Sequence, residues 1–220
     1  MKRRDFIILL GGAAGWPLSA RAQQNVGPVI GFLHSQTSDG FPEPLREFRQ
    51  ALKESGYVEG DNLAIEYGWA QNQPGRLRSL TADLVSRRVA VLAAMDTPSA
   101  LAAKEAMAPV PVVFMTGIDP VAAGLVASLA RPGGNLTGVN FLSGELTAKR
   151  LGVVRELIPG ATRFAVLLNT VDIANSETTM RDVETAARPM KLQLRFLNVG
   201  TNQEITAAFA SFVGDDPTRC

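Results

Sequence analysis

Short runs of consecutive apolar residues alternate with longer segments of helical periodicity along most of this chain. The first four runs lie near residues 28–34, 63–67, 89–94 and 110–115. Strands that are apolar throughout are buried on both faces, so these runs predict a parallel sheet covered by helices on both sides. Right-handed crossovers between the strands then give a doubly wound α/β lobe.

The segments between these runs carry the signals of helices. Residues 41–56 place apolar side chains at helical spacing and end at Gly56, a typical residue just beyond a helix. Residues 74–87 repeat the pattern. Thr97 is the expected N-cap of a third helix, with proline at its first helical position. A fourth helix is expected over about 121–130.

Residues 131–135 (RPGGN) interrupt this rhythm, and a second α/β unit follows. Its expected strands and helices, in chain order, cover residues 136–142, 144–158, 164–168, 176–188, 192–199 and 203–212. A doubly wound lobe has about five or six strands, so the second lobe is expected to be incomplete. We divide the chain into an export signal (1–22), a first lobe (23–138), a partial second lobe (139–213) and an irregular tail (214–220).

The N-terminus has the features of a bacterial export signal. Residues 2–4 (KRR) are basic, a short apolar run with glycines follows, and residues 20–22 (ARA) form the small-x-small pattern that precedes signal cleavage. The run is far shorter than the ~20 residues of a membrane-spanning helix. Arg3 and Arg4 resemble a twin-arginine motif; a Sec signal with two incidental arginines is the alternative. The mature protein is therefore expected in the periplasm, cleaved near Ala22.

Removing the signal changes the charge that the folded protein carries. Residues 1–22 hold four of the 22 basic and one of the 21 acidic residues, so 18 basic and 20 acidic residues remain. This balance predicts no nucleic-acid partner. Cys220 is the only cysteine and His34 the only histidine. We therefore expect no disulfide, no metal site, no cofactor and no Ser-His-Asp triad.

Longer segments of the chain resemble one known family as a set. They are PVIGFLHS (28–35), LKESGYVEGDN (52–62), IEYGW (65–69), PVVFMTGIDP (111–120), SLARPGGNLTG (128–138) and KRLGVVRELIP (149–159). Together they resemble the tryptophan/tyrosine-type family of ABC-transporter substrate-binding proteins, and the resemblance extends from residue 1 to about residue 213. It implies the type I periplasmic-binding-protein plan, in which two α/β lobes are joined by a hinge.

The resemblance implies a monomeric solute receptor rather than an enzyme. Such a receptor binds a small molecule, here an amino acid or a related organic acid, and delivers it to an ABC permease in the inner membrane. Members of the family continue further through the second lobe, so a C-terminally truncated chain is expected. Two alternatives stay open: a truncated gene product without function, and an exported α/β enzyme. The enzyme lacks support because no GxSxG motif is present.

Candidate ligand-binding residues follow from the position of the strands. Ligands of open α/β sheets bind beyond the carboxyl ends of the strands. From the residues that follow the expected strands in both units, we take as candidates Ser35, Gln36, Thr97, Ser99, Thr116, Gly117 and Asn169.

The expected helix start at Thr97 is suited to a carboxylate. Its unpaired backbone N–H groups carry partial positive charge, and the hydroxyls of Ser99 and Thr116 add hydrogen-bond donors. The alternative is that Thr97 is only an N-cap and that Thr116 begins a simple turn. Asp119, at the expected start of the fourth helix, is expected to cap that helix rather than bind an ammonium group, and His34 to pack at the end of its strand.

Replacing both signal arginines by lysine, Arg3→Lys with Arg4→Lys, is expected to keep the precursor in the cytoplasm. Twin-arginine receptors read the guanidinium pair, and lysine lacks its planar fork. Cell fractionation with immunoblotting for the cleaved form measures the effect, with Lys2→Arg as a charge-preserving control. Normal processing of the double variant would identify Sec as the route.

Overall fold

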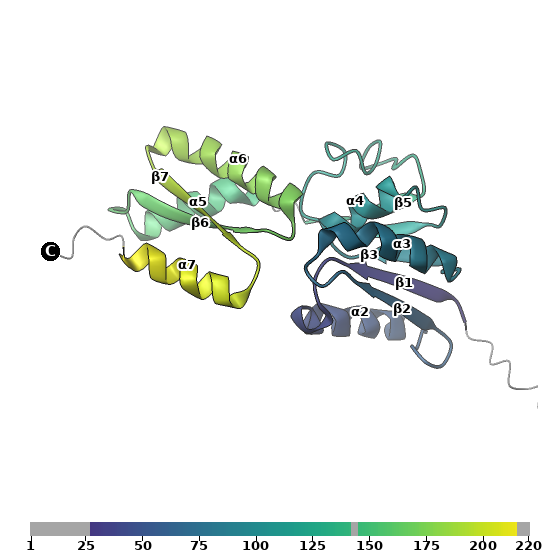
Figure 1. The fold of residues 1–220 in the computed structure, drawn as a ribbon. Helices are drawn as coiled ribbons and strands as arrows, with labels where there is room; N and C mark the ends of the chain where they lie inside the picture. The colour runs from purple at the N-terminus through teal and green to yellow at the C-terminus, as the bar shows by residue number, and fades with distance from the viewer. Residues whose placement is uncertain (1–26, 142–144, 215–220) are drawn as a thin grey trace, which may run out of the picture.

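The computed structural model describes residues 27–141 and 145–214 (Figure 1). The expected export signal and most of the expected tail lie outside these residues. The described chain forms two α/β lobes that follow each other in sequence. No described helix combines the length and the apolar character needed to cross a membrane.

The first lobe is built on a five-stranded parallel sheet with the strand order β2-β1-β3-β4-β5. Its strands are β1 (Val29–His34), β2 (Ala64–Trp69), β3 (Val91–Ala94), β4 (Val112–Thr116) and β5 (Leu136–Asn140). The expected α/β fold with a parallel sheet is confirmed. Because all strands run in one direction, their carboxyl ends meet at a single edge of the sheet.

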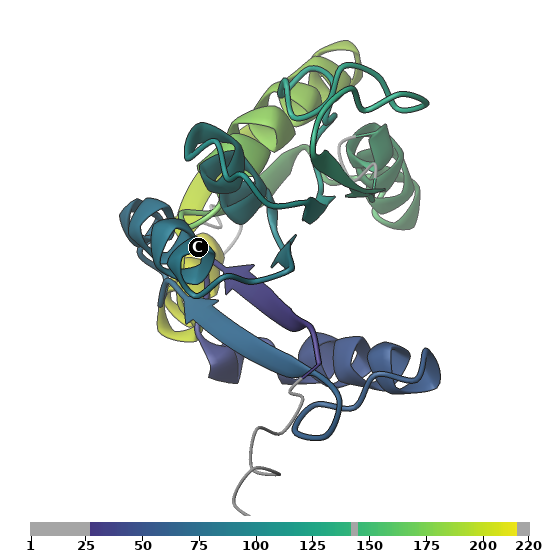
Figure 2. The ribbon, with the colours of Figure 1, turned by 90° about the vertical axis from the view of Figure 1, so that its right-hand side faces the viewer.

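Helices cover both faces of this sheet (Figures 1 and 2). α2 (Pro42–Glu54) lies on one face, while α3 (Leu77–Ser86) and α4 (Thr97–Glu105) lie on the other. Short 3₁₀ turns, η2 (Ser38–Gly40) and η3 (Pro74–Arg76), precede α2 and α3.

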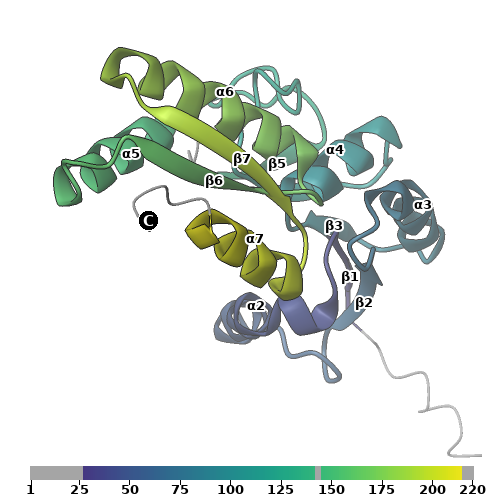
Figure 3. The same ribbon diagram turned by 60° about the vertical axis from the view of Figure 1, so that its left-hand side comes forward.

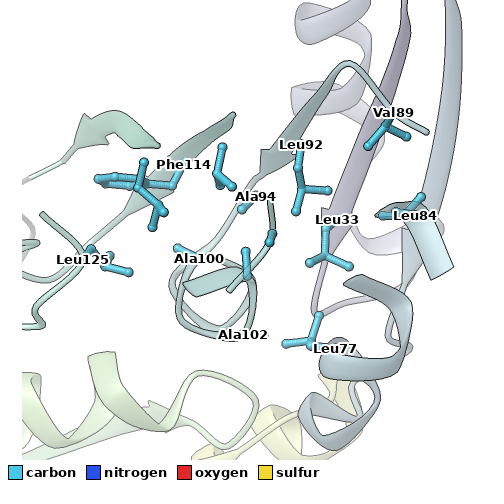
Figure 4. Close-up of a cluster of buried hydrophobic side chains, with 14 of the residues drawn as sticks. Leu33, Leu77, Leu84, Val89, Leu92, Ala94, Ala100, Ala102, Phe114 and Leu125 are labelled. Carbon is cyan, nitrogen blue, oxygen red and sulfur yellow. The ribbon is translucent and has the colours of Figure 1, made fainter. Parts of the chain in front are cut away.

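Alternate residues of β1 supply the two cores. Leu33 is fully buried with Leu92 and Ala94 of β3 against α3 and α4 (Figure 4). Phe32 is fully buried on the α2 face, where its ring contacts that of Phe48. The alternation follows from the two-residue period of a strand.

The helix expected over 121–130 is absent from the structure, which has turns there. Gly124 has φ +67°, a left-handed conformation that an α-helix does not contain. The backbone N–H groups of Leu125 and Val126 both donate to the carbonyl of Pro120, closing a compact loop instead. Apolar spacing was a misleading signal here, because Leu125 and Val126 are buried from a turn rather than from a helix face.

The strand expected to open the second unit belongs to the first sheet. β5 pairs with β4 along its length, from Val112 opposite Leu136 to Thr116 opposite Asn140. Gly138 permits this pairing, because a side chain there would overlap the carbonyl oxygen of Phe114. The described part of the second lobe therefore has two strands, not three.

The second lobe is a parallel pair of strands with three helices. Its elements are α5 (Glu145–Leu157), β6 (Arg163–Asn169), α6 (Ile173–Met190), β7 (Gln193–Val199) and α7 (Asn202–Gly214). α5 and α6 pack on one face through Leu151, Val183 and Ala187, and α7 lies on the opposite side (Figure 3). Its buried core is small, and Leu167 of β6 and Phe209 of α7 are 38% and 63% exposed.

Amide hydrogen exchange is expected to be faster across residues 162–213 than across 28–130. A two-stranded sheet with exposed apolar side chains opens at lower free energy than a five-stranded sheet covered on both faces. Exchange followed by mass spectrometry measures this, with the edge strand β2 as the reference. Protection of β6 and β7 equal to that of β1 and β3 would contradict the expectation.

Candidate functional site

A cavity of about 390 Å³ lies where the carboxyl ends of β1, β3 and β4 face the second lobe. From the first lobe it is lined by residues that end or follow these strands: His34, Ser35, Gln36, Met95, Asp96, Thr97, Met115, Thr116 and Gly117. From the second lobe it is lined by Asn169, Asp172 and Asn175. We call this space the interlobe cleft. Its position agrees with the rule that places ligands beyond the carboxyl ends of parallel strands.

The structure brings six of the seven predicted residues to the interlobe cleft: Ser35, Gln36, Thr97, Thr116, Gly117 and Asn169. Gln36 and Asn169 also line a neighbouring cavity of about 430 Å³ with residues at the start of α7. The seventh, Ser99, does not line the cleft. It is fully buried, and its hydroxyl has no hydrogen-bond partner among the described residues.

Asp96, rather than Thr97, is the N-cap of α4. Its backbone is extended, with φ −157° and ψ 170°, and one carboxylate oxygen accepts the N–H of Ser99 at 2.9 Å. The other oxygen accepts the N–H of Ser35 at 2.9 Å and also the Ser35 hydroxyl. Asp96 therefore joins the ends of β1 and β3 to the first turn of α4.

This arrangement changes the electrostatics that the sequence suggested. The N-terminus of α4 was expected to attract a ligand carboxylate, but the protein's own carboxylate already caps it. A second anion at the same point would meet the negative charge of Asp96. The helix start is consequently a poor place for a ligand carboxylate.

Thr97 and Thr116 form a buried hydroxyl pair. Their Oγ1 atoms are 3.0 Å apart, and the two side chains join the start of α4 to the end of β4. The N–H of Gly117 donates to Thr97 Oγ1 and that of Ile118 to Thr116 Oγ1, each at 3.3 Å. Both hydroxyl groups therefore lie at the cleft in positions that the backbone defines.

His34 packs at the end of β1 as expected, and it also lines the cleft. Its ring centroid is 4.2 Å from that of Phe41, and its Nδ1 lies 3.2 Å from Asp96 Oδ2. Burial lowers the pKa of His34, and the nearby Asp96 carboxylate only partly offsets this. With its pKa below the ordinary value, His34 is mainly neutral at neutral pH.

Asp172 is the functional candidate that the sequence interpretation missed. It is the N-cap of α6, and its Oδ1 accepts the N–H of Asn175 at 3.1 Å. Burial, together with the charge of Asp96 across the cleft, raises its pKa to about 6, against lowering contributions from the Asn175 N–H and the Thr97 hydroxyl. A detectable signal was present, because Asp172 stands only three residues beyond the end of β6.

Apolar side chains complete the cleft wall. Phe41, Met95, Met115 and Phe141 line it, and Phe141 is 55% exposed. Among the described residues that line the cleft none is lysine or arginine, whereas two are aspartate. The cleft thus combines an apolar surface with acidic and hydrogen-bonding groups. Asp119 lies outside it and caps a turn instead of the expected helix, which is absent; its carboxylate accepts the N–H groups of Val121 and Ala122.

Comparison with known proteins gives related sequences. Residues 35–217 match the family described as ABC transporter substrate binding protein. A tyrosine-binding protein of Clostridioides difficile strain R20291 is 34% identical over 168 residues, which are 76% of this chain and 48% of that protein. The chain therefore spans about half the length of this curated relative.

Solved structures share the fold. A conserved domain protein from Vibrio cholerae O1 biovar El Tor has a TM-score of 0.73 and 25% identity, covering 84% of this chain and 62% of that one. An ABC domain from Streptococcus pneumonia in complex with L-Trp has a TM-score of 0.70 and 21% identity, covering 86% and 63%. Both extend beyond the part that matches this chain.

Asp96→Ala is expected to lower the free energy of unfolding by about 2–3 kcal/mol, because it removes a helix cap and leaves Ser35 and Ser99 donors unpaired. Asp119→Ala removes an exposed turn cap and is expected to cost less than about 1 kcal/mol. Urea denaturation of both variants measures the difference. Equal losses of unfolding free energy would show that Asp96 stabilises the fold no more than the exposed turn cap Asp119 does.

Proposed function

The chain belongs to the family of ABC transporter substrate-binding proteins, and from that premise we propose that it is an extracytoplasmic solute receptor for an ABC importer. It holds a small organic solute between its two lobes, which close on it by hinge motion. Its partners are the solute and an ABC permease of the inner membrane. It acts as a monomer, without a cofactor.

The observation that carries this proposal is the composition of the interlobe cleft. Loops after four parallel strands, three in one lobe and one in the other, contribute polar side chains to a single space of about 390 Å³. Small-molecule sites are concave, largely apolar and furnished with a few polar groups, and they often lie between domains. A space lined from both sides also gives a ligand a physical reason to favour closure.

The proposed ligand is an amino acid or a related carboxylate. The relative from Clostridioides difficile is named for tyrosine. The structure from Streptococcus pneumonia contains L-Trp, and its 21% identity supports the fold rather than the ligand. In this chain, Phe41 and Phe141 offer aromatic contact, and Gln36 and Asn169 offer amide hydrogen bonds.

The geometry of Ser35 argues against the alternative of an exported enzyme. A serine nucleophile needs a base that accepts its proton, and histidine usually fills that role. Here the Ser35 hydroxyl donates to Asp96, and His34 Nδ1 lies beside the same carboxylate. We infer that these three residues form a structural junction and do not act as a catalytic group.

The proposed location follows from the N-terminal sequence. Residues 1–22 lie outside the described structure and have the pattern of a cleaved export signal. We propose that they direct the protein through the twin-arginine route and that the mature chain works in the periplasm.

Thermal unfolding against a panel of amino acids and organic acids tests the function. A ligand that binds only the folded protein stabilises it by about 2.7 kcal/mol at a hundredfold excess over its Kd. An aromatic amino acid such as L-tyrosine is expected to raise the Tm. No shift with any member of the panel would contradict the proposed ligand class.

Thr116→Val is expected to weaken binding of the stabilising compound by about ten- to a hundredfold, because it removes a hydroxyl of the buried pair at the cleft. Thr81→Val is the matched control, since Thr81 is also fully buried but its hydroxyl bonds Leu77 within α3. Calorimetric titration compares the two. Equal affinities would place the site elsewhere.

A further inference from the structure

Two carboxylates, one from each lobe, face each other across the interlobe cleft. Asp96 stands at the start of α4 and Asp172 at the start of α6. We propose that Asp172 determines which solutes the cleft accepts: the lobes close on a solute that carries an ammonium group and reject one of the same shape that carries only a carboxylate. This inference rests on the proposed solute-binding function and decides between its two ligand classes.

The two carboxylates differ in what they can offer a ligand. Asp96 already accepts the N–H and hydroxyl of Ser35 and the N–H of Ser99. Its hydrogen-bonding capacity is therefore largely used within the first lobe. Asp172 has one oxygen bonded to the N–H of Asn175, while the Thr97 hydroxyl approaches its carboxyl group from the other lobe. A carboxylate can accept about four hydrogen bonds, so Asp172 keeps capacity for a ligand donor.

The charges around Asp172 favour a cation. Across the cleft it faces Asp96 and the Thr97 hydroxyl, and His34, which also lines the cleft, has its Nδ1 3.2 Å from Asp96 Oδ2. His34 is mainly neutral at neutral pH because burial lowers its pKa. The cleft lining, as far as the structure describes it, contains no lysine or arginine. Closing the lobes with both carboxylates ionised thus brings two negative charges together in a partly buried space, which is unfavourable without a neutralising group.

A proton or an ammonium group can supply that neutralisation. The pKa of Asp172 is raised to about 6, first by burial and then by the charge of Asp96. Above about pH 6 Asp172 is ionised, opposes closure of the empty cleft and attracts a cation. Below about pH 6 it is protonated, so closure meets less repulsion and the attraction for an ammonium group is lost. Affinity for a cationic solute should therefore fall as the pH falls through this range.

The same charges disfavour a plain organic acid. Its carboxylate would add a third negative charge and would leave the two aspartates without a counter-charge. The carboxylate of an amino acid is tolerated because its ammonium group meets Asp172 while the carboxylate lies toward donors such as the Gln36 and Asn169 amides, which also line the cleft.

Asp172→Asn is the test variant, and it keeps the start of α6 intact because asparagine is as good an N-cap as aspartate. Glu177→Gln is the matched control. It makes the same change of charge on α6, at an exposed position that does not line the cleft.

Calorimetry at about pH 7.5 with L-tyrosine and with its deamino analogue, 3-(4-hydroxyphenyl)propanoate, measures the selectivity. The wild type is expected to prefer L-tyrosine by about ten- to a hundredfold, and Asp172→Asn is expected to weaken the binding of L-tyrosine by a similar factor without weakening that of the analogue.

At about pH 5 the wild type should bind L-tyrosine roughly tenfold more weakly than at pH 7, and the variant should lose this pH dependence. Equal binding of both compounds by the wild type, or an equal loss for both in the variant, overturns the inference and leaves the solute-binding function standing.

Small-angle X-ray scattering without any ligand tests, independently of the solute, whether ionised Asp172 opposes closure of the lobes. The wild type and Glu177→Gln are expected to be more compact at about pH 5 than at pH 7.5, whereas Asp172→Asn is expected to be equally compact at both. If no compound binds but this pattern is found, the ligand class is wrong and the role of Asp172 in closure holds. A wild-type radius of gyration that is the same at both pH values overturns that role.

Discussion

The carboxylate of Asp96 holds the cleft edge of the first lobe together. It accepts hydrogen bonds from Ser35 after β1 and from Ser99 in the first turn of α4, and so joins the ends of β1 and β3 to the start of α4. Thr97 follows directly and meets Thr116 at the end of β4 through the buried hydroxyl pair. The first-lobe wall of the cleft is therefore formed by groups that are hydrogen-bonded to one another, and it is preorganised.

The second lobe contributes a different kind of surface. Asn169 is exposed, Asp172 and Asn175 are partly buried, and all three surround the start of α6. These groups are rigid relative to their own lobe, because Asp172 caps α6 and Asn169 Oδ1 accepts the N–H of Val171. In the proposed closure of the lobes, their distance from the first lobe changes. The proposed selectivity therefore has two parts, a preorganised first-lobe wall and the charge of Asp172 on the second lobe.

Sequence periodicity was most informative for strands and least informative for the segment between β4 and β5. The four apolar runs of the first lobe all became strands of one parallel sheet, and β1 and β3 at its centre are almost fully buried. Residues 121–130 carried apolar residues at helical spacing, but Gly124 in a left-handed conformation turned them into a loop. The cap of α4 was misplaced by one residue, since Asp96 and Thr97 are both good caps; in the structure Asp96 accepts the N–H of Ser99, whereas the Thr97 hydroxyl pairs with Thr116.

The sequence by itself determined where the strands end, and with that it determined most of the cleft. Parallel strands bring their carboxyl ends to one edge, so the residues that follow them meet without further information. Only the tertiary structure decided that β5 completes the first sheet, that Ser99 is turned into the interior and that Asp172 faces Asp96. These outcomes depend on how separate lobes and helices pack in space. Periodicity reports only local secondary structure, so it does not predict such packing.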